Sequence, residues 1–171
     1  MDNSKDTFWF AVYTNPRAEK KVYERITHLK FNAYLPLIST LKIWSDRKKK
    51  VSIPLIPSYV FVFCKKEELI KVLSLQGVVK ILTFKGVPAI VKQHEITNMK
   101  ILLQDFDQVE SYEQISILKG EKVEVINGPF LGLIAQAIDY QGNYRLVVEL
   151  EVFKRFLTVN VPISFVRRFS E

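Results

Sequence analysis

The stretch Ile56-Pro57-Ser58-Tyr59-Val60-Phe61-Val62-Phe63 contains the most apolar run in a chain of 171 residues. From Tyr59 to Phe63 the apolar and aromatic residues follow one another without polar alternation. A continuous run of this length predicts a strand that is buried on both faces, whereas a half-exposed strand would alternate. We therefore expect a central strand of a sheet here.

The residues on both sides of this run predict further regular elements. Residues 8–13 form another apolar and aromatic run of strand length, closed by Asn15-Pro16, a pair that favours a turn and a helix entry. Between residues 17 and 30 the apolar side chains recur every three or four positions, which predicts one face of a helix. A β-hairpin is expected around residues 41–54, a short helix over 66–73, a strand over 77–82 and a helix over 92–103. This order predicts an α+β domain of roughly 100 residues, with helices packed on a mainly antiparallel sheet.

The pattern changes in the last third of the chain. Residues 104–118 lack periodicity and hold a run of acids without basic partners, so we predict an interdomain linker there. Short alternating segments then follow, at 122–126, 133–140, 144–150, 156–159 and 163–169. Five short strands in about fifty residues predict a small all-β barrel, because an open sheet of that size would leave exposed edges. The expected division is a polar leader at 1–7, an N-terminal domain at 8–103, an acidic linker at 104–118 and a barrel domain at 119–171.

The charge of the chain is concentrated in its N-terminal part. Residues 1–100 hold 18 basic and 8 acidic side chains, whereas residues 101–171 hold 7 basic and 10 acidic ones. A domain-sized segment with this excess of positive charge usually faces a polyanion or an acidic partner. The N-terminal domain is therefore the candidate binding domain.

Two groups of cations within that domain are candidates for binding phosphates. On the predicted helix, one row has helical spacing and Lys20 lies beside it; the row consists of Arg17, Lys21, Arg25 and His28. At the predicted hairpin tip, four cations follow one another: Arg47, Lys48, Lys49 and Lys50. Consecutive cations repel each other and offer no packing, so phosphate contact explains them at least as well as solubility does. A merely solvated helix face explains the first row equally well.

Several classes of protein are not expected. No window reaches the roughly 18 apolar residues that a membrane-spanning helix requires, and the polar start does not resemble a secretory signal. A cytoplasmic protein without membrane contact is therefore expected. With Cys64 as its one cysteine and His28 and His94 as its histidines, the chain lacks the ligand clusters of a metal site and any recognisable catalytic motif. We expect no cofactor, no metal and no enzymatic activity, and a monomeric chain.

Three segments resemble a known family. The segment from Lys119 to Leu133, with the sequence KGEKVEVINGPFLGL, resembles a KOW motif. The segments WFAVY at 9–13 and PSYVFV at 57–62 resemble the N-terminal (NGN) domain of NusG-type transcription elongation factors. Residues 51–62 and Pro88-Ala89-Ile90-Val91 are similar to specialised paralogues of the RfaH and UpxY type.

This resemblance implies a factor that binds bacterial RNA polymerase at the β′ clamp helices, contacts the non-template DNA strand, and suppresses pausing or termination, in the paralogues at long polysaccharide-type operons. Docking on a helical coiled coil requires an apolar, aromatic-lined surface, and the candidates for it are Tyr13, Ile56, Pro57, Tyr59 and Phe61. The alternative for such strand aromatics is a place in the core. The candidates for DNA contact are Arg17, Lys20, Lys21, Arg25, His28 and the cations from Arg47 to Lys50. Leu75-Gln76-Gly77 lacks the basic residue that RfaH-like proteins carry before this glycine, so sequence-specific recruitment of the RfaH kind is not carried over.

In relatives the KOW domain contacts a small-subunit ribosomal protein or the termination factor Rho, and in RfaH it can refold as a helical hairpin. We expect this domain to remain a barrel, because glycines and a proline interrupt it and valines, which favour strands, are frequent in it. The alternative function is a KOW-containing module that binds structured RNA or the ribosome, since such barrels also occur in ribosomal proteins.

Overall fold

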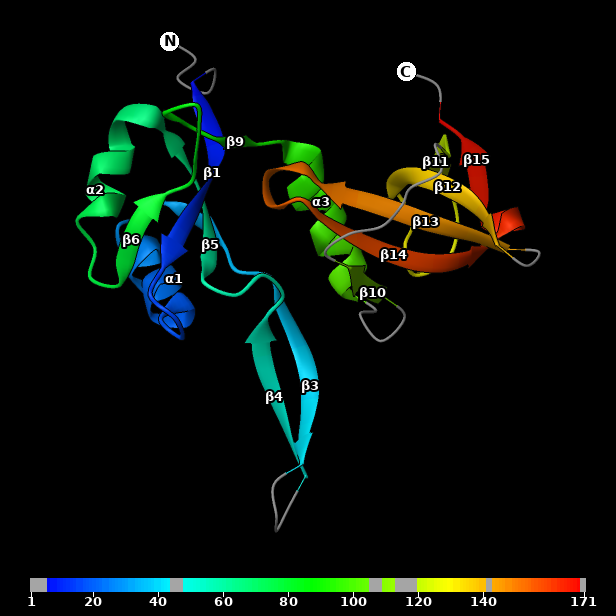
Figure 1. Cartoon of the computed structure of the whole chain (residues 1–171), viewed down its shortest axis with the longest axis horizontal. Helices are drawn as coiled ribbons and strands as arrows, with labels where there is room; N and C mark the ends of the chain where they lie inside the picture. The colour runs from blue at the N-terminus through cyan, green and yellow to red at the C-terminus, as the bar shows by residue number, and fades with distance from the viewer. Residues whose placement is uncertain (1–5, 44–47, 105–108, 113–119, 141–142, 170–171) are drawn as a thin grey trace. The chain divides into compact units, whose positions relative to one another are not determined.

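The computed structural model of the chain describes residues 6–43, 48–104, 109–112, 120–140 and 143–169. The chain divides into two compact units, Met1–Gln93 and His94–Glu171. The first unit combines helices with an antiparallel sheet, and the second is mostly strands with their own sheet, as Figure 1 shows. The predicted fold class, an α+β domain followed by a small all-β domain, is confirmed.

The sheet of the first unit has the strand order β2-β5-β1-β6, and β9 also pairs with β1. Every pairing in it is antiparallel. The predicted central strand is confirmed, because β5 lies between β2 and β1. The strands are β1 (Thr7–Thr14), β2 (Asn32–Tyr34), β5 (Tyr59–Lys65), β6 (Val78–Ile81) and β9 (Ile90–Val91).

Two helices cover one face of this sheet. These are α1 (Glu19–His28) and α2 (Leu69–Leu73), the latter preceded by the 3₁₀ turn η1 (Lys66–Glu68). Their apolar side chains pack into one core with the inward side chains of β1, β5 and β6; its buried members include Phe10, Val12, Val22, Ile26, Val60, Val62, Leu69, Val72 and Ile81. Burial of such a cluster is the main favourable contribution to the folding of the unit. Among the described residues, no helix is long and apolar enough to span a membrane.

A long hairpin of β3 (Leu37–Ile43) and β4 (Lys48–Pro54) extends from this unit, as predicted. Figure 1 shows it projecting away from the sheet that carries it. A second, short hairpin joins β7 (Thr83–Phe84) to β8 (Val87–Pro88). Among the described side chains of β3 and β4, only Leu37 packs against the core of the first unit.

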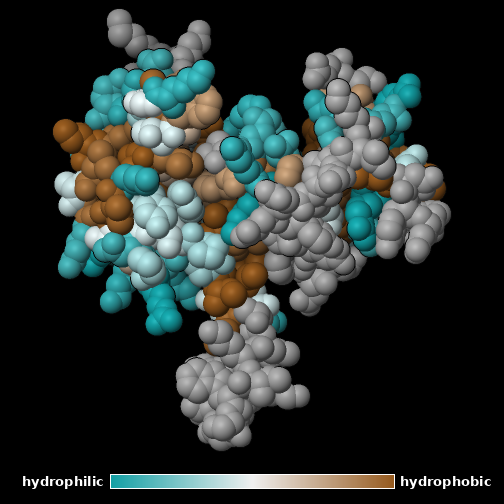
Figure 2. Space-filling model, viewed as in Figure 1, coloured by the Kyte–Doolittle hydropathy of each residue, from teal (hydrophilic) through white to brown (hydrophobic). Residues whose placement is uncertain are grey.

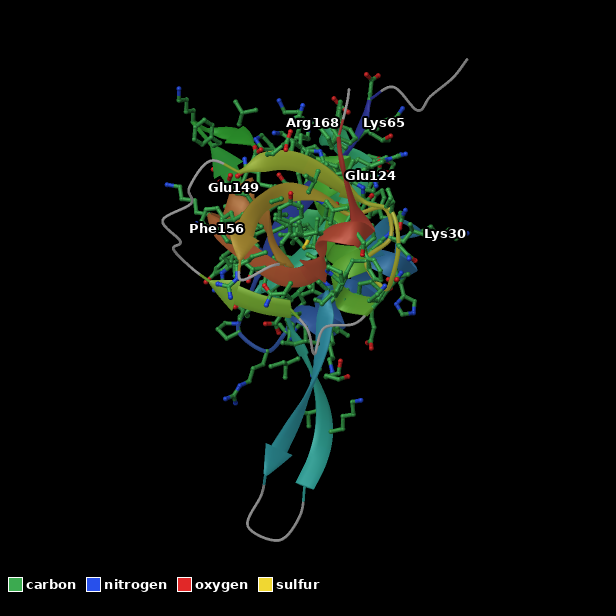
Figure 3. The ribbon with its side chains drawn as sticks, turned by 90° about the vertical axis from the view of Figure 1, so that its right-hand side faces the viewer. Lys30, Lys65, Glu124, Glu149, Phe156 and Arg168 are labelled. Carbon is green, nitrogen blue, oxygen red and sulfur yellow. The ribbon has the colours of Figure 1, made fainter. Side chains whose placement is uncertain are left out.

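The second unit consists of a helix and a six-stranded antiparallel sheet with the order β10-β14-β13-β12-β11-β15. Figure 3 shows the strands curling around a shared interior. The interior side chains include Val125, Phe130, Leu133, Leu146 and Leu157, each almost fully buried. The elements are α3 (Gln93–Leu102), β10 (Val109–Tyr112), β11 (Glu121–Val125), β12 (Ile134–Tyr140), β13 (Asn143–Leu150), the 3₁₀ turn η3 (Glu151–Phe153), β14 (Arg155–Pro162), the 3₁₀ turn η4 (Ile163–Phe165) and β15 (Val166–Arg168).

The five strands predicted for this part of the chain are all present, as β11 to β15, and two features differ from the sequence prediction. First, β10 lies within the segment predicted as a linker and pairs with β14; its acidic neighbours concealed a four-residue strand. Second, α3 groups with the second unit. The side chain of Asn98 on α3 donates from Nδ2 to the carbonyl oxygen of Ile134, 3.0 Å away, and this contact between distant segments is not visible in the sequence.

Cys64 is a buried member of the core of the first unit. Burial, with a smaller effect of the Glu68 charge, raises the pKa of the Cys64 thiol to about 12. About 1 thiol in 10,000 is then ionised at pH 8, and the thiolate is the reactive form. We expect mass spectrometry to detect almost no alkylation of the native protein at pH 8 and full alkylation of the protein in denaturant. The thiol ionises more easily in the unfolded chain, where its pKa has the ordinary value of 9.0. Its raised pKa in the native protein therefore contributes to the stability of the folded state, fully below pH 9, and this contribution is lost as the pH rises toward 12. Rapid alkylation of the native protein at pH 8 would contradict the expectation that Cys64 is protected from alkylation.

Candidate functional site

The face of the first sheet opposite α1 and α2 carries a series of aromatic side chains. Side chains alternate along a strand, and the inward-facing residues of β1 and β5 pack with the two helices, so their neighbours point to the other face. The register then pairs Trp9 with Phe63 and Tyr13 with Tyr59, while Phe61 lies beside Tyr34 of β2. We call this set the aromatic face; its members are Trp9, Tyr13, Tyr34, Tyr59, Phe61 and Phe63.

The aromatic face is built from close ring pairs. The ring centroids of Trp9 and Phe63 are 5.3 Å apart, and those of Tyr34 and Phe61 are 6.1 Å apart. Trp9 is buried, and its indole Nε1 donates to Oε1 of Gln93 at 2.8 Å. Tilted pairs at these distances add to the stability that burial provides, so this part of the face is a rigid support.

Tyr13 and Tyr59 form the end of the aromatic face that lies beside Lys80. Both side chains are half-buried, their ring centroids are 5.2 Å apart, and Nζ of Lys80 lies 5.6 Å from the centre of the Tyr13 ring. Partial burial, together with the neighbouring Tyr13, raises the pKa of Tyr59 above its ordinary value of 10.0. This end offers two rings and a lysine cation to a partner.

The structure divides the five predicted docking residues into accessible and buried ones. Tyr13 and Tyr59 are half-buried and Pro57 is exposed, so these three can meet a partner. Ile56 retains 3% of its accessible surface and Phe61 retains none. In this structure Ile56 and Phe61 can therefore contribute by supporting the three accessible residues.

The predicted cationic row on α1 is also divided by the structure. Lys21 and His28 lie on the helix and are exposed. Arg17 is exposed as well, but it precedes the helix and has a φ of 65°, so it does not continue the helical spacing. Lys20 is exposed, and its Nζ donates to the carbonyl oxygen of Ser52 at 2.9 Å. Figure 2 shows hydrophilic side chains around α1.

Arg25 has a partner within the chain. Its guanidinium donates to the carbonyl oxygen of Gln76, and its Nη2 donates to Oε1 of the same residue at 3.1 Å. The side chain is half-buried, and it ties α1 to the loop before β6. Arg25 is thus engaged in holding this loop, whereas Arg17 and Lys21 extend from the surface without such a contact among the described hydrogen bonds.

The basic hairpin tip is described in part. Lys50 on β4 is exposed. Arg47 lies outside the described residues, and so do the side chains of Lys48 and Lys49.

Two residues near these surfaces were not found by sequence reasoning. Lys80 lies opposite Tyr13 in the pairing of β1 with β6, and Gln76 is the partner of Arg25. The polar Lys80 interrupts an otherwise apolar strand, which is a weak signal, but the register that places it beside Tyr13 requires the assembled sheet. Among the described residues, no group of three or more His, Cys, Asp or Glu side chains could hold a metal ion.

Comparison with known proteins identifies the family. The family model described as transcription termination factor NusG matches residues 7–100, which include the aromatic face and α1. A solved structure on domain interaction in Thermotoga maritima NusG is 22% identical, with a TM-score of 0.51, and the match covers 98% of this chain and 100% of that one. Two conformations of the MjSpt4:Spt5 complex are also similar, at 22% and 21% identity with TM-scores of 0.29 and 0.28; each match covers 95% of this chain, and 99% and 97% of the other. Because the family model covers more than half of the sequence, the chain belongs to the NusG family.

Proposed function

We propose that this protein is a transcription elongation factor that binds bacterial RNA polymerase at the β′ clamp helices. The observation that carries the proposal is the accessible Tyr13–Tyr59 pair, which lies on the sheet face opposite the two packed helices and beside the exposed Pro57. Rigid aromatic side chains at the centre of a contact contribute most of the binding energy in many interfaces. A helical pair laid across this end could bury both rings, and Lys80 could meet an acidic side chain.

The same factor is proposed to contact the non-template DNA strand through α1 and the β3–β4 hairpin. Lys20 and Lys21 on α1, Lys50 on β4, and Arg17 just before α1 supply exposed positive charge there. Attraction between lysine or arginine side chains and phosphates provides affinity without regard to base sequence. We further propose that such contacts suppress pausing or termination, as in the specialised paralogues that act on long polysaccharide-type operons.

Partner contact through the second unit is also proposed, with a small-subunit ribosomal protein and Rho as the two candidates. Leu131 is 62% exposed on the loop between β11 and β12, and Ile126 and Ile163 are also exposed. The amide of Ile126 donates to the carbonyl oxygen of Phe165 at 2.7 Å, which brings the turn η4 next to that loop. These apolar side chains could form a small contact surface.

The test compares the affinity of the purified protein for a reconstituted bacterial elongation complex that exposes its non-template strand with its affinity for the same nucleic-acid scaffold without polymerase. We expect tight binding that requires polymerase and that is lost when the β′ clamp helices are deleted. Equal binding to the bare scaffold would instead support the RNA-binding alternative. Binding to neither would reject the elongation-factor function and make the alternative, a module that binds structured RNA or the ribosome, the leading function. A read-through assay on a pause-rich template then tests the effect on elongation.

Replacing Arg17 and Lys21 together with alanine is expected to weaken the DNA contribution to this binding. Each phosphate contact to a single strand contributes about 0.7 to the slope of log affinity against log salt, so the slope should fall by about 1.4. This slope is measured by fluorescence anisotropy binding titrations at a series of salt concentrations. Lys100→Ala with Lys154→Ala, two exposed lysines of the second unit, is the matched control. If the slope of log affinity against log salt does not differ between the two double variants, Arg17 and α1 do not contact DNA.

A further inference from the structure

The segment that leads into β5 is held in an unusual backbone conformation. Ser58 has a φ of 63°, in the left-handed region that residues with a side chain adopt at a cost. Such a residue persists where its surroundings hold it. Ser58 stands between two residues of the proposed docking surface, the exposed Pro57 and the half-buried Tyr59, so its conformation sets the direction of both.

Two hydrogen bonds hold Ser58, one to its carbonyl oxygen and one from its amide. The amide of Thr14 on β1 donates to the carbonyl oxygen of Ser58 at 2.8 Å. The amide of Ser58 donates to Oε1 of Glu19 at 2.8 Å. The first bond extends the β1–β5 pairing. In the second, the acceptor is a side chain of α1.

Glu19 is a buried carboxylate, with 6% of its surface accessible. It is the first residue of α1, where the unpaired amides of the helix end favour negative charge. A carboxylate that accepts a backbone N–H forms one of the stronger kinds of hydrogen bond in proteins. The position of Glu19 in the first turn therefore reduces the free-energy cost of burying its charge. It also places the carboxylate within hydrogen-bond distance of the Ser58 amide.

The next residue makes a similar contact to the neighbouring strand. Nζ of Lys20 donates to the carbonyl oxygen of Ser52 on β4 at 2.9 Å. The first turn of α1 thus holds two points of the segment 52–58, one at the base of the long hairpin and one at the docking surface. The helix proposed to meet DNA is directly connected to the residues proposed to meet polymerase.

We propose that Glu19 is a positioning residue that holds Ser58 in its left-handed conformation and thereby orients Pro57 and Tyr59 for docking. This inference rests on the proposed function for its effect on binding, but the local effect at Ser58 is independent of any partner. Without Glu19 the amide of Ser58 loses its acceptor, and the 57–59 segment samples other conformations. Binding then requires this segment to be ordered again, which lowers the affinity.

The test measures two quantities for the full chain, hydrogen exchange of the Ser58 amide and affinity for the elongation complex. For Glu19→Ala we expect exchange at Ser58 to be at least tenfold faster, while amides of Val60 to Val62 keep their protection, and affinity to fall about tenfold. Glu19→Gln retains an oxygen acceptor, so both quantities should stay within about threefold of the wild type. Glu24→Ala replaces an exposed glutamate of the same helix and serves as the matched control.

If Glu19→Ala does not fold, the same comparison is made in a Ser58→Gly background, because glycine adopts a positive φ without strain. Unchanged exchange at Ser58 in Glu19→Ala overturns the proposal, and so does loss of protection throughout β5, which would indicate a general structural role. Faster exchange at Ser58 with unchanged affinity also overturns it. If the wild type itself does not bind polymerase, the proposed function fails, and the exchange data still decide whether Glu19 holds Ser58.

Discussion

Replacing Tyr13 and Tyr59 together with alanine is expected to lower the affinity of the protein for the elongation complex at least 100-fold. Truncation of an aromatic side chain at the centre of an interface costs about 2 kcal/mol or more, and the two rings contact each other, so their effects are not simply additive. Each tenfold loss corresponds to about 1.4 kcal/mol. A loss of two orders of magnitude is thus a conservative expectation for removing both rings.

The measurement is a binding titration of the double variant, with melting curves to show that it remains folded. Both residues are half-buried, so a modest fall in melting temperature is expected as well. A double Tyr→Phe variant retains both rings and should keep most of the affinity. Tyr144→Ala, at a half-buried tyrosine of the second unit, is the matched control. If the folded Tyr13→Ala/Tyr59→Ala variant binds as tightly as wild type, the aromatic face is not the docking surface.

Gly120→Ala is expected to have the largest effect on stability, and it should act on the second unit. A Cβ atom added at Gly120 would clash with the carbonyl oxygen of Ala137 on β12. That oxygen belongs to the backbone of a paired strand, so the clash cannot be relieved by rotation of a side chain. Forcing apart closely packed backbone costs about 3 kcal/mol, which lowers the melting temperature of a unit of this size by roughly 12–24 °C.

Amide signals of β11 to β14 followed during thermal unfolding measure this effect in the second unit. Gly86→Ala provides the comparison, because an added Cβ there meets nothing within 4 Å, although Gly86 has a φ of 80°. That substitution should cost about 1 kcal/mol of backbone strain and act on the first unit. An equal effect of the two substitutions would show that close approach of the backbone at Gly120 is unimportant.

Much of the fold could be predicted because its signals are local. The continuous apolar run at 59–63 identifies β5, and the spacing of Val22 and Ile26 identifies α1. Each depends on the repeat of a strand or a helix, which neighbouring residues are sufficient to establish. The exact ends of the elements depend less on neighbouring residues alone. For example, α1 begins at Glu19 and not at Arg17, because Arg17 adopts a positive φ.

The candidate site was predicted less completely for a physical reason. Tyr59 and Phe61 have similar side chains and point to the same face of β5, yet Tyr59 is half-buried and Phe61 is fully buried. Likewise Lys21 and Arg25 share one helical row, but the guanidinium of Arg25 is bonded to Gln76, 51 residues away. Exposure and hydrogen bonding depend on partners that are distant in the chain.

The sequence by itself determined the order of the elements, the α+β character of the first unit, the strand-rich second unit and the resemblance to the NusG family, because periodicity and short motifs are properties of neighbouring residues. Only the tertiary structure decided which members of the aromatic face are fully buried, which cations of α1 are engaged within the chain, and that Glu19 meets Ser58. These depend on strand register and on the packing of α1 beside β4 and β5, which arise when distant segments assemble around a common core.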